Sequence, residues 1–262
     1  MRDPGLEQAI QTAGGVRALA RALGVSQPAV SMWKRIPAER VADIEAITGI
    51  PRAKLRPDLF NSNRMTDLDL DPVDQARAQE YGLLGLLLWR APDAGVLKKL
   101  SGLRGDATPI GMAHLDLSLA AADAKPDDLQ REFFDLFIGL GRGELLPYAS
   151  FYLTGFLHEK PLARVREDFI RLGIAREQRV SEPEDHIAVL CEVMSGLIRG
   201  DFGVDGGAPY SDAQFFDRHM SRWAAKFFAD LETANAAKFY RKVGTLGRIF
   251  MEIEAEAFAL PA

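Results

Sequence analysis

Four side chains that can exchange protons lie within five residues, in the segment Glu182-Pro183-Glu184-Asp185-His186. Carboxylates beside an imidazole can act as general acid and base, or can bind a metal ion. One interpretation is a helical metal-dependent hydrolase that uses Glu184, Asp185 and His186. The alternatives are a binding loop and a structural loop that catalyses nothing.

The other candidate ligands in the chain do not favour a metal site. A helical metal site needs ligands one turn apart, and no two of the four histidines have that spacing. The only cysteine, Cys191, excludes an internal disulfide framework, and its place on an apolar helical face favours a core position. The sequence therefore predicts no catalytic residue, no metal ion and no cofactor.

The elements that position these groups are expected to be helices. Pro183 and the apolar run after His186 indicate a loop that enters a helix, expected over 183–199. Strand signals are scarce throughout the chain, so we predict an all-α fold. A central helix should begin with Asp71 as its N-cap and Pro72 at its first position. Further helices are expected near 93–101, 109–123, 126–139, 147–157, 160–172, 211–232 and 234–258.

The N-terminal stretch "VRALARALGVSQPAVSMWKR" has the pattern of a helix-turn-helix. Ala20 is the small residue that lets the two helices cross closely, and Gly24 provides the turn. Ser26 should cap the second helix. Val25, Val30 and Trp33 should hold that helix against the first, which leaves several polar and basic side chains facing outward.

Those outward side chains could contact DNA. A glutamine can read an adenine edge or hold a phosphate, and basic side chains meet phosphates. The candidate DNA-binding residues are Ser26, Gln27, Ser31, Lys34, Arg35, Arg17 and Arg21. Together with the tail "IPAERVADIEAITGIPRAKLRPDLF", this stretch resembles the YdaS/Cro-like helix-turn-helix family over about residues 5–60. The alternative is a small helical bundle that has lost DNA binding.

A boundary follows this stretch. We expect a first domain over 1–60, a polar linker over 61–72, "NSNRMTDLDLDP", and a second domain over 73–262. Residues 1–60 hold 9 Lys and Arg against 6 Asp and Glu, a net +3, and the remainder holds 23 against 31, a net −8. A basic head on an acidic body suggests two domains with different partners.

The second domain resembles the TorD/DmsD family of cytoplasmic chaperones for molybdenum-cofactor enzymes, over about residues 73–258. The resemblance rests on four segments: "FFDLFIGLGRGELLPYASFYLTG", "EPEDHIAVLCEVMSGLI", "FFDRHMSRWAAKFFADL" and "FYRKVGTLGRIFMEIEAEAF". It implies binding rather than catalysis. The implied ligand is the twin-arginine signal peptide, or the apo form, of a molybdoenzyme catalytic subunit.

The resemblance also implies binding residues. Asp185 and His186 would lie at the peptide-binding surface, and Glu182 and Pro183 would shape the loop. Tyr148, Tyr152 and Trp223 either line the site or belong to the core. The competing interpretation of Asp185 and His186 is a helix N-terminal cap. Carboxylates and an apolar groove suit a peptide with two guanidinium groups and an apolar run.

We therefore expect a cytoplasmic maturation chaperone with a head that binds double-stranded DNA. The alternative is a transcriptional regulator whose chaperone-like domain senses the apo-enzyme or signal peptide. The longest apolar cluster, Tyr81–Trp89, is too short to cross a bilayer, so no membrane insertion is expected. A DNA-binding head of this size would need a second copy for useful affinity, and the TorD/DmsD resemblance is also compatible with a homodimer.

Overall fold

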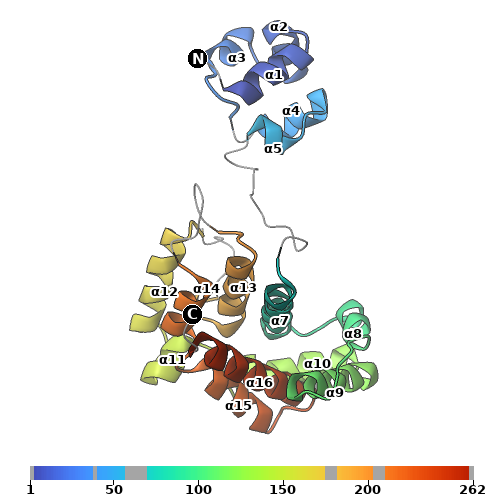
Figure 1. Cartoon of the computed structure of the whole chain (residues 1–262), viewed down its shortest axis with the longest axis vertical. Coiled ribbons are helices and arrows are strands. Elements are labelled where there is room, and N and C mark those ends of the chain that lie inside the picture. The colour runs from blue at the N-terminus through green and yellow to red at the C-terminus, as the bar shows by residue number, and fades with distance from the viewer. Residues whose placement is uncertain (1–2, 38–39, 57–69, 175–181, 203–209, 260–262) are drawn as a thin grey trace. The chain divides into compact units, whose positions relative to one another are not determined.

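The computed structural model describes residues 3–37, 40–56, 70–174, 182–202 and 210–259 (Figure 1). The chain divides into two compact units, Met1–Met65 and Thr66–Ala262. Every regular element in the described ranges is helical, which confirms the predicted all-α class. Most of the predicted linker, residues 61–69 of 61–72, lies outside the described residues.

In the described residues of the first unit, five short helices surround a small core. They are α1 (Pro4–Thr12), α2 (Val16–Ala22), α3 (Gln27–Met32), α4 (Val41–Thr48) and α5 (Arg52–Leu55). The core comprises Leu6, Ala9, Leu19, Ala20, Val30, Ile36, Val41, Ile44, Ile50 and Leu55.

Helices α2 and α3 form the predicted helix-turn-helix. Gly24 takes a positive φ of 66° in the turn, a conformation that a side chain would disfavour. The hydroxyl of Ser26 accepts the backbone N–H of Ala29 and caps α3, as predicted. Val30 is fully buried and Ala20 nearly so, which seats α3 against α2.

The described residues of the second unit form α-helices of 6 to 21 residues and one π-helical turn. They are α7 (Pro72–Trp89), α8 (Ala94–Leu100), α9 (Pro109–Asp123), α10 (Pro126–Phe133), η2 (Phe134–Ile138), α11 (Ala149–Thr154), α12 (Lys160–Arg171), α13 (Ile187–Ile198), α14 (Asp212–His219), α15 (Ala224–Thr233) and α16 (Phe239–Ala259). Asp71 caps α7 by accepting the backbone N–H groups of Val73 and Asp74, as predicted.

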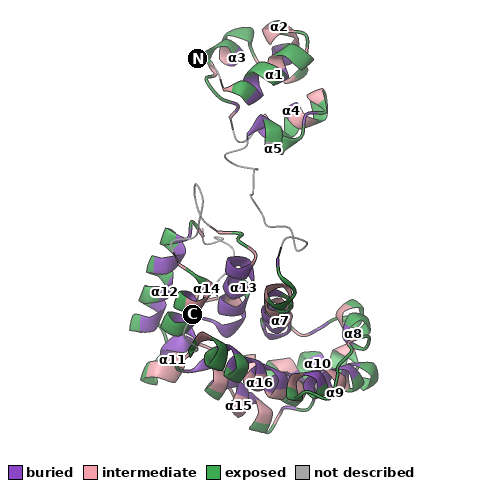
Figure 2. Ribbon diagram, viewed as in Figure 1, coloured by how far each residue is buried: buried purple, intermediate pink, exposed green. Residues whose placement is uncertain are grey.

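Helix α13 lies at the centre of this unit and packs along α7. Figure 2 shows it buried over most of its surface, and Cys191, Met194 and Leu190 on it are fully buried. Helices α15 and α16 form a second tight pair. A Cβ at Gly247 would lie 2.2 Å from the ring of Phe228, so only glycine allows this close approach.

Several predicted helices have different boundaries in the structure, such as the one expected over 234–258, which begins at Phe239. The helix expected over 183–199 begins at Ile187, because the chain before it pairs with the segment in front of α11. The helix expected over 211–232 breaks between His219 and Ala224 into α14 and α15. In this break the indole N–H of Trp223 donates to the carbonyl of His219 at 2.6 Å, so Trp223 turns inward beside α14.

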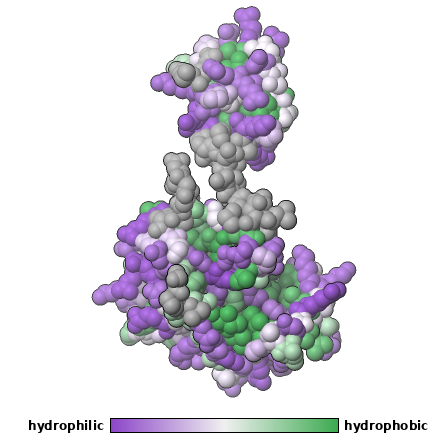
Figure 3. Space-filling model, in the orientation of Figure 1, coloured by the Kyte–Doolittle hydropathy of each residue, from purple (hydrophilic) through white to green (hydrophobic). Residues whose placement is uncertain are grey.

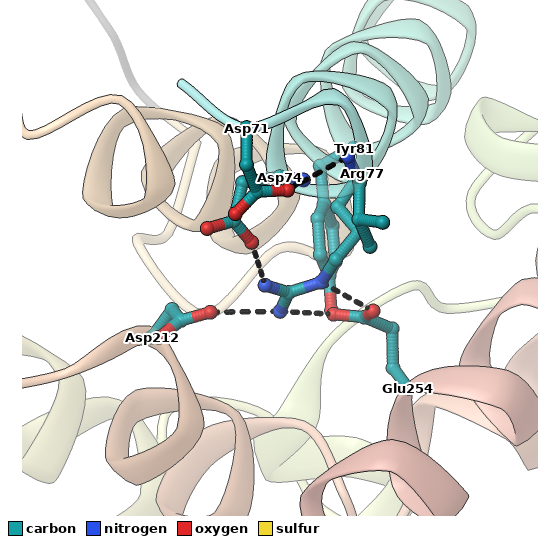
Figure 4. Close-up of polar contacts among 7 residues, drawn as sticks. Asp71, Asp74, Arg77, Tyr81, Asp212 and Glu254 are labelled. Atoms are coloured by element: carbon teal, nitrogen blue, oxygen red, sulfur yellow. Dashed lines mark hydrogen bonds and ion pairs between the residues drawn. The ribbon is translucent and has the colours of Figure 1, made fainter. Parts of the chain in front are cut away.

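Arg77 joins three separate helices near the start of α7 (Figure 4). Its guanidinium group donates to Glu254 of α16 at 2.7 and 2.8 Å, to Asp212 of α14 at 2.7 Å and to Asp74 of α7 at 2.7 Å. The hydroxyl of Tyr81 also donates to Glu254, at 3.0 Å. Bidentate contacts of this kind fix both the position and the orientation of the side chains. Arg77 therefore fastens the first turns of α7 to α14 and α16.

None of the helices in the described ranges has both the length and the apolar character needed to cross a membrane.

Candidate functional site

The loop Glu182–His186 is fastened to the segment before α11 by backbone and side-chain hydrogen bonds. The Asp185 carboxylate accepts the backbone N–H of Ser150 at 2.8 Å, and the Asp185 carbonyl accepts the N–H of Ala149 at 3.0 Å. The Ile187 N–H donates to the carbonyl of Pro147 at 2.9 Å. These bonds clamp the loop at the start of α13.

Asp185 and His186 are both buried, with 0% and 6% of their surface exposed. The sequence placed them at a peptide-binding surface and Asp185 in the first helical turn. The structure corrects only the helical position, because Asp185 precedes α13, and one of its carboxylate oxygens accepts the Ser150 N–H. A role of either residue in binding a client stays a prediction.

His186 is the N-cap of α13. Its ring Nδ1 accepts the backbone N–H of Ala188 at 3.0 Å, so the proton of the neutral ring is on Nε2. Burial lowers the pKa of His186 to about 3. The ring is therefore neutral at physiological pH and serves as a fixed acceptor rather than a cation.

Two aromatic rings lie against His186 and form the accessible part of the site. The Tyr148 ring is 5.2 Å from the imidazole and the Trp89 ring is 6.1 Å from it, both edge to face. Trp89 ends α7 and is 43% exposed. The sequence analysis missed Trp89; the polar Arg90 directly after the apolar run was the signal that the helix leaves the core here.

Glu182 and Glu184 are the partly exposed carboxylates of the loop. Glu182 accepts a hydrogen bond from the Tyr148 hydroxyl, and Glu184 pairs with Arg166 of α12 at 2.9 Å. Burial, followed by the bond to Glu182, raises the pKa of Tyr148 above its usual value. The Tyr148 hydroxyl therefore stays a donor, and Pro183 lies half-buried between the two glutamates.

Tyr152 and Trp223 form a separate group from the loop. Their rings are 5.4 Å apart, and the Tyr152 hydroxyl donates to Asp230 of α15 at 3.0 Å. Trp223 is 2% exposed. Trp223 therefore packs in the core, and Tyr152 reaches the surface only as a partly buried ring.

The loop is not arranged as a reaction centre in this conformation. Asp185 and His186 each face a backbone N–H, while Glu184 faces Arg166, so the three groups do not converge. Within the described residues, no three His, Cys, Asp or Glu side chains stand close enough to hold a metal ion together.

In the first unit, the predicted DNA-binding residues differ in exposure and in where they lie relative to α3. Gln27 and Ser31 on α3 and Arg17 and Arg21 on α2 are exposed. Ser26 is engaged in capping α3. Because α3 ends at Met32, Lys34 and Arg35 come from the segment after the helix, and Arg35 lies 3.4 Å from Asp3.

Met32 is a further exposed residue of α3 that the sequence analysis did not single out. It is 81% exposed at the end of that helix. An exposed apolar side chain on a recognition helix can contact a thymine methyl group.

Both parts of the chain are similar to known proteins. Residues 104–229 match the model of the nitrate reductase delta subunit family, and residues 6–64 match that of the bacterial toxin YdaS family. The chaperone protein TorD of Vibrio cholerae is 28% identical over 203 residues, covering 70% of this chain and 92% of that protein. TorD of Aliivibrio fischeri is 30% identical over 139 residues, covering 50% and 65%.

The second unit is therefore similar to TorD and the first to the YdaS family, so they are named the TorD-like unit and the YdaS-like head. TorD of Shewanella loihica is similar over a greater length, with 24% identity over 213 residues, 72% of this chain and 96% of that protein. Among solved structures, a redox enzyme maturation protein from Archaeoglobus fulgidus matches with 22% identity and a TM-score of 0.47, covering 67% of this chain and 93% of that one.

In the TorD-like unit, the matched segment 104–229 contains the loop Glu182–His186 and Tyr148, whereas Trp89 stands before it. Figure 3 shows apolar side chains gathered on the visible face of this unit, over the region of α7 and α16. Leu86, Trp89 and Ile253 are exposed apolar residues on these two helices. All seven predicted DNA-binding residues lie in the part of the YdaS-like head matched at 6–64.

Proposed function

We propose that the chain is a maturation chaperone for a molybdenum-cofactor oxidoreductase. Its TorD-like unit binds the signal peptide or the apo form of that client at the surface formed by Trp89, Tyr148 and the loop Glu182–Pro183–Glu184. The observation that carries the proposal is the exposed Trp89 ring held against the buried, uncharged His186 cap.

The chemistry of this surface suits a polypeptide with cationic and apolar parts. Glu182 and Glu184 offer carboxylates, with which guanidinium groups form charge-assisted hydrogen bonds. Trp89 and Leu86 offer an apolar rim that accepts a helical or extended apolar run. Asp185 and His186 support the surface from behind, because Asp185 Oδ2 and His186 Nδ1 each accept a backbone N–H.

Co-purification from the native host tests this function. The full-length chain should retain one large redox-enzyme subunit in its apo form, and a chain carrying Trp89→Ala should retain much less. Ile170→Ala is a matched control, because Ile170 is an exposed apolar residue on a different helix. Equal recovery of the subunit with Trp89→Ala would show that this surface is not where the client binds.

A second function is supported by the YdaS-like head. The Ser26-capped helix α3 presents Gln27 and Ser31, and Arg17 and Arg21 are exposed on α2. We propose that the head binds double-stranded DNA as a pair of copies. The protein would then act as a regulator if the client binds the DNA-competent form with a different affinity, since equal affinity shifts nothing.

Client maturation and DNA binding can be separated in the full-length protein. Replacing Gln27, Arg17 and Arg21 by Ala should abolish DNA binding and leave activation of the client intact. Trp89→Ala should abolish activation of the client and leave DNA binding intact. A head variant that fails to mature its client would show instead that the two functions are one.

A further inference from the structure

Three arginines converge on a small pocket that the proposed client surface does not use. Arg164 comes from α12, Arg218 from α14, and Arg222 from the break between α14 and α15. Apolar side chains, including Leu153, Val165 and Trp223, form much of the rest of the lining. Asp217 is the only carboxylate that lines the pocket, so positive charge dominates there, on a unit that is acidic as a whole.

The arginines differ in what they already bind. Arg218 donates to the buried carboxylate of Asp168 at 2.6 Å, and that carboxylate also takes hydrogen bonds from His219 and Tyr210 at 2.7 and 2.9 Å. Asp168 is therefore saturated by its neighbours. Within the described residues, neither Arg164 nor Arg222 has an ion-pair or hydrogen-bond partner, so their guanidinium groups remain available.

The size of the pocket limits its ligand. The cavity holds about 20 Å³, room for a single small group and not for a nucleotide base or sugar. Guanidinium groups bind carboxylates through paired hydrogen bonds. The apolar lining residues and the exposed arginines together suit a carboxylate side chain that has apolar side chains on either side of it. An acidic amphipathic polypeptide has this chemistry.

We propose that Arg164, Arg218 and Arg222 form a second docking site, which takes an acidic segment of a polypeptide partner. This site is next to the first one without sharing its exposed groups. Ala149 lines the pocket, and its backbone N–H donates to the Asp185 carbonyl of the loop. A partner could therefore place a cationic part at Glu182 and Glu184 and an acidic part at the arginines.

Fluorescence anisotropy with a labelled peptide of alternating Glu and Leu tests the site directly in the full-length protein. The peptide should bind the wild-type chain with an affinity that falls as salt rises. Replacing Arg164 and Arg222 together by Gln should weaken binding at least about tenfold, since each loses a charge-assisted hydrogen bond. Both side chains are exposed, so the variant should keep its helical circular dichroism.

A control variant and a control peptide test whether binding is specific to these arginines. Arg241→Gln removes an exposed charge at the start of α16, beyond the far end of α15 from the pocket, and should leave the affinity unchanged. A Lys-Leu peptide should not bind at these arginines. The proposal is overturned if the wild-type chain does not bind the acidic peptide, or if Arg241→Gln weakens binding as much as the double variant. It is also overturned if inorganic phosphate or GTP, at the same concentration as the peptide, displaces the peptide. Failure here leaves the Trp89 surface untouched, because the probe carries no cationic group.

Discussion

The ring of Trp89 meets the ring of His186 edge to face, with ring centroids 6.1 Å apart. This contact joins the end of α7 to the cap of α13, the two helices that pack most extensively in the TorD-like unit. One partner is half-exposed and the other is buried, so the pair connects the accessible surface to the core.

Stability should fall in acid because of His186. Its pKa is about 3 in the folded chain, against 6.5 ordinarily, so between these values the unfolded chain binds a proton that the folded chain does not. The free energy of unfolding should therefore drop by up to about 1.4 kcal/mol for each pH unit below 6.5. His186→Asn keeps a capping acceptor and should flatten this slope. Urea unfolding at several pH values measures it, and parallel curves for the two chains would contradict the assignment.

Asp185→Ala should destabilise the fold rather than only weaken client binding. The substitution leaves the buried N–H of Ser150 without its acceptor, which costs about 1–3 kcal/mol. Asp185→Asn keeps one oxygen as acceptor and should cost less. The denaturation midpoints of the wild-type chain, Asp185→Ala and Asp185→Asn measure these differences in stability. Wild-type stability together with lost client binding in Asp185→Ala would restore the contact role that the sequence suggested.

Arg77→Ala should be among the most damaging single changes in the TorD-like unit. It leaves the Glu254 carboxylate, 1% exposed, without its ion-pair partner, and breaking a buried pair in this way costs about 3 kcal/mol or more. Arg77→Lys keeps the charge and loses the paired hydrogen bonds, so its free energy of unfolding should lie between those of the wild-type chain and Arg77→Ala. Arg241→Ala serves as an exposed control. An unfolding free energy for Arg77→Ala within about 0.5 kcal/mol of the control would show that the cluster adds little.

The basic residues of the head should differ in their effect on DNA binding. Arg17→Ala and Arg21→Ala should each reduce the slope of log affinity against log salt by about one, as expected for a lost phosphate contact. Arg35→Ala should have a smaller effect, because Asp3 already lies 3.4 Å from its guanidinium group. Anisotropy of a labelled duplex across a salt series measures all three. Identical slopes for every variant would mean that α2 does not face the DNA.

Local signals in the sequence were sufficient for the helix caps. Ser26 and Asp71, each followed by proline in the first turn, need only their own neighbours to cap a helix, and both do so. The predicted single helix over 211–232 was wrong: Phe215, His219, Trp223 and Phe227 recur at steps of four, which suits one helix but also fits two helices that pack against the same core. The break between α14 and α15 depends on where Trp223 finds a hydrogen-bond partner, which is a tertiary contact.

The site was predictable only in part for the same reason. The motif at 182–186 marked the right loop, but burial decides which of its groups a partner can reach. Asp185 and His186 face backbone amides from distant or following residues, and the accessible ring beside them, Trp89, stands about a hundred residues earlier in the chain. Long-range packing of α7 against α13 brings Trp89 to His186, and no local sequence pattern predicts this contact.

The central claim is that Trp89 and the glutamates of the loop bind a cationic, apolar client segment. Isothermal titration of the full-length chain with the client's twin-arginine signal peptide, or with the apo subunit where the client has no such signal, tests it most directly. Trp89→Ala should weaken binding at least about tenfold and Glu182→Gln by less, since a fully packed aromatic anchor contributes more than a rim charge. Wild-type affinity in Trp89→Ala would contradict the account.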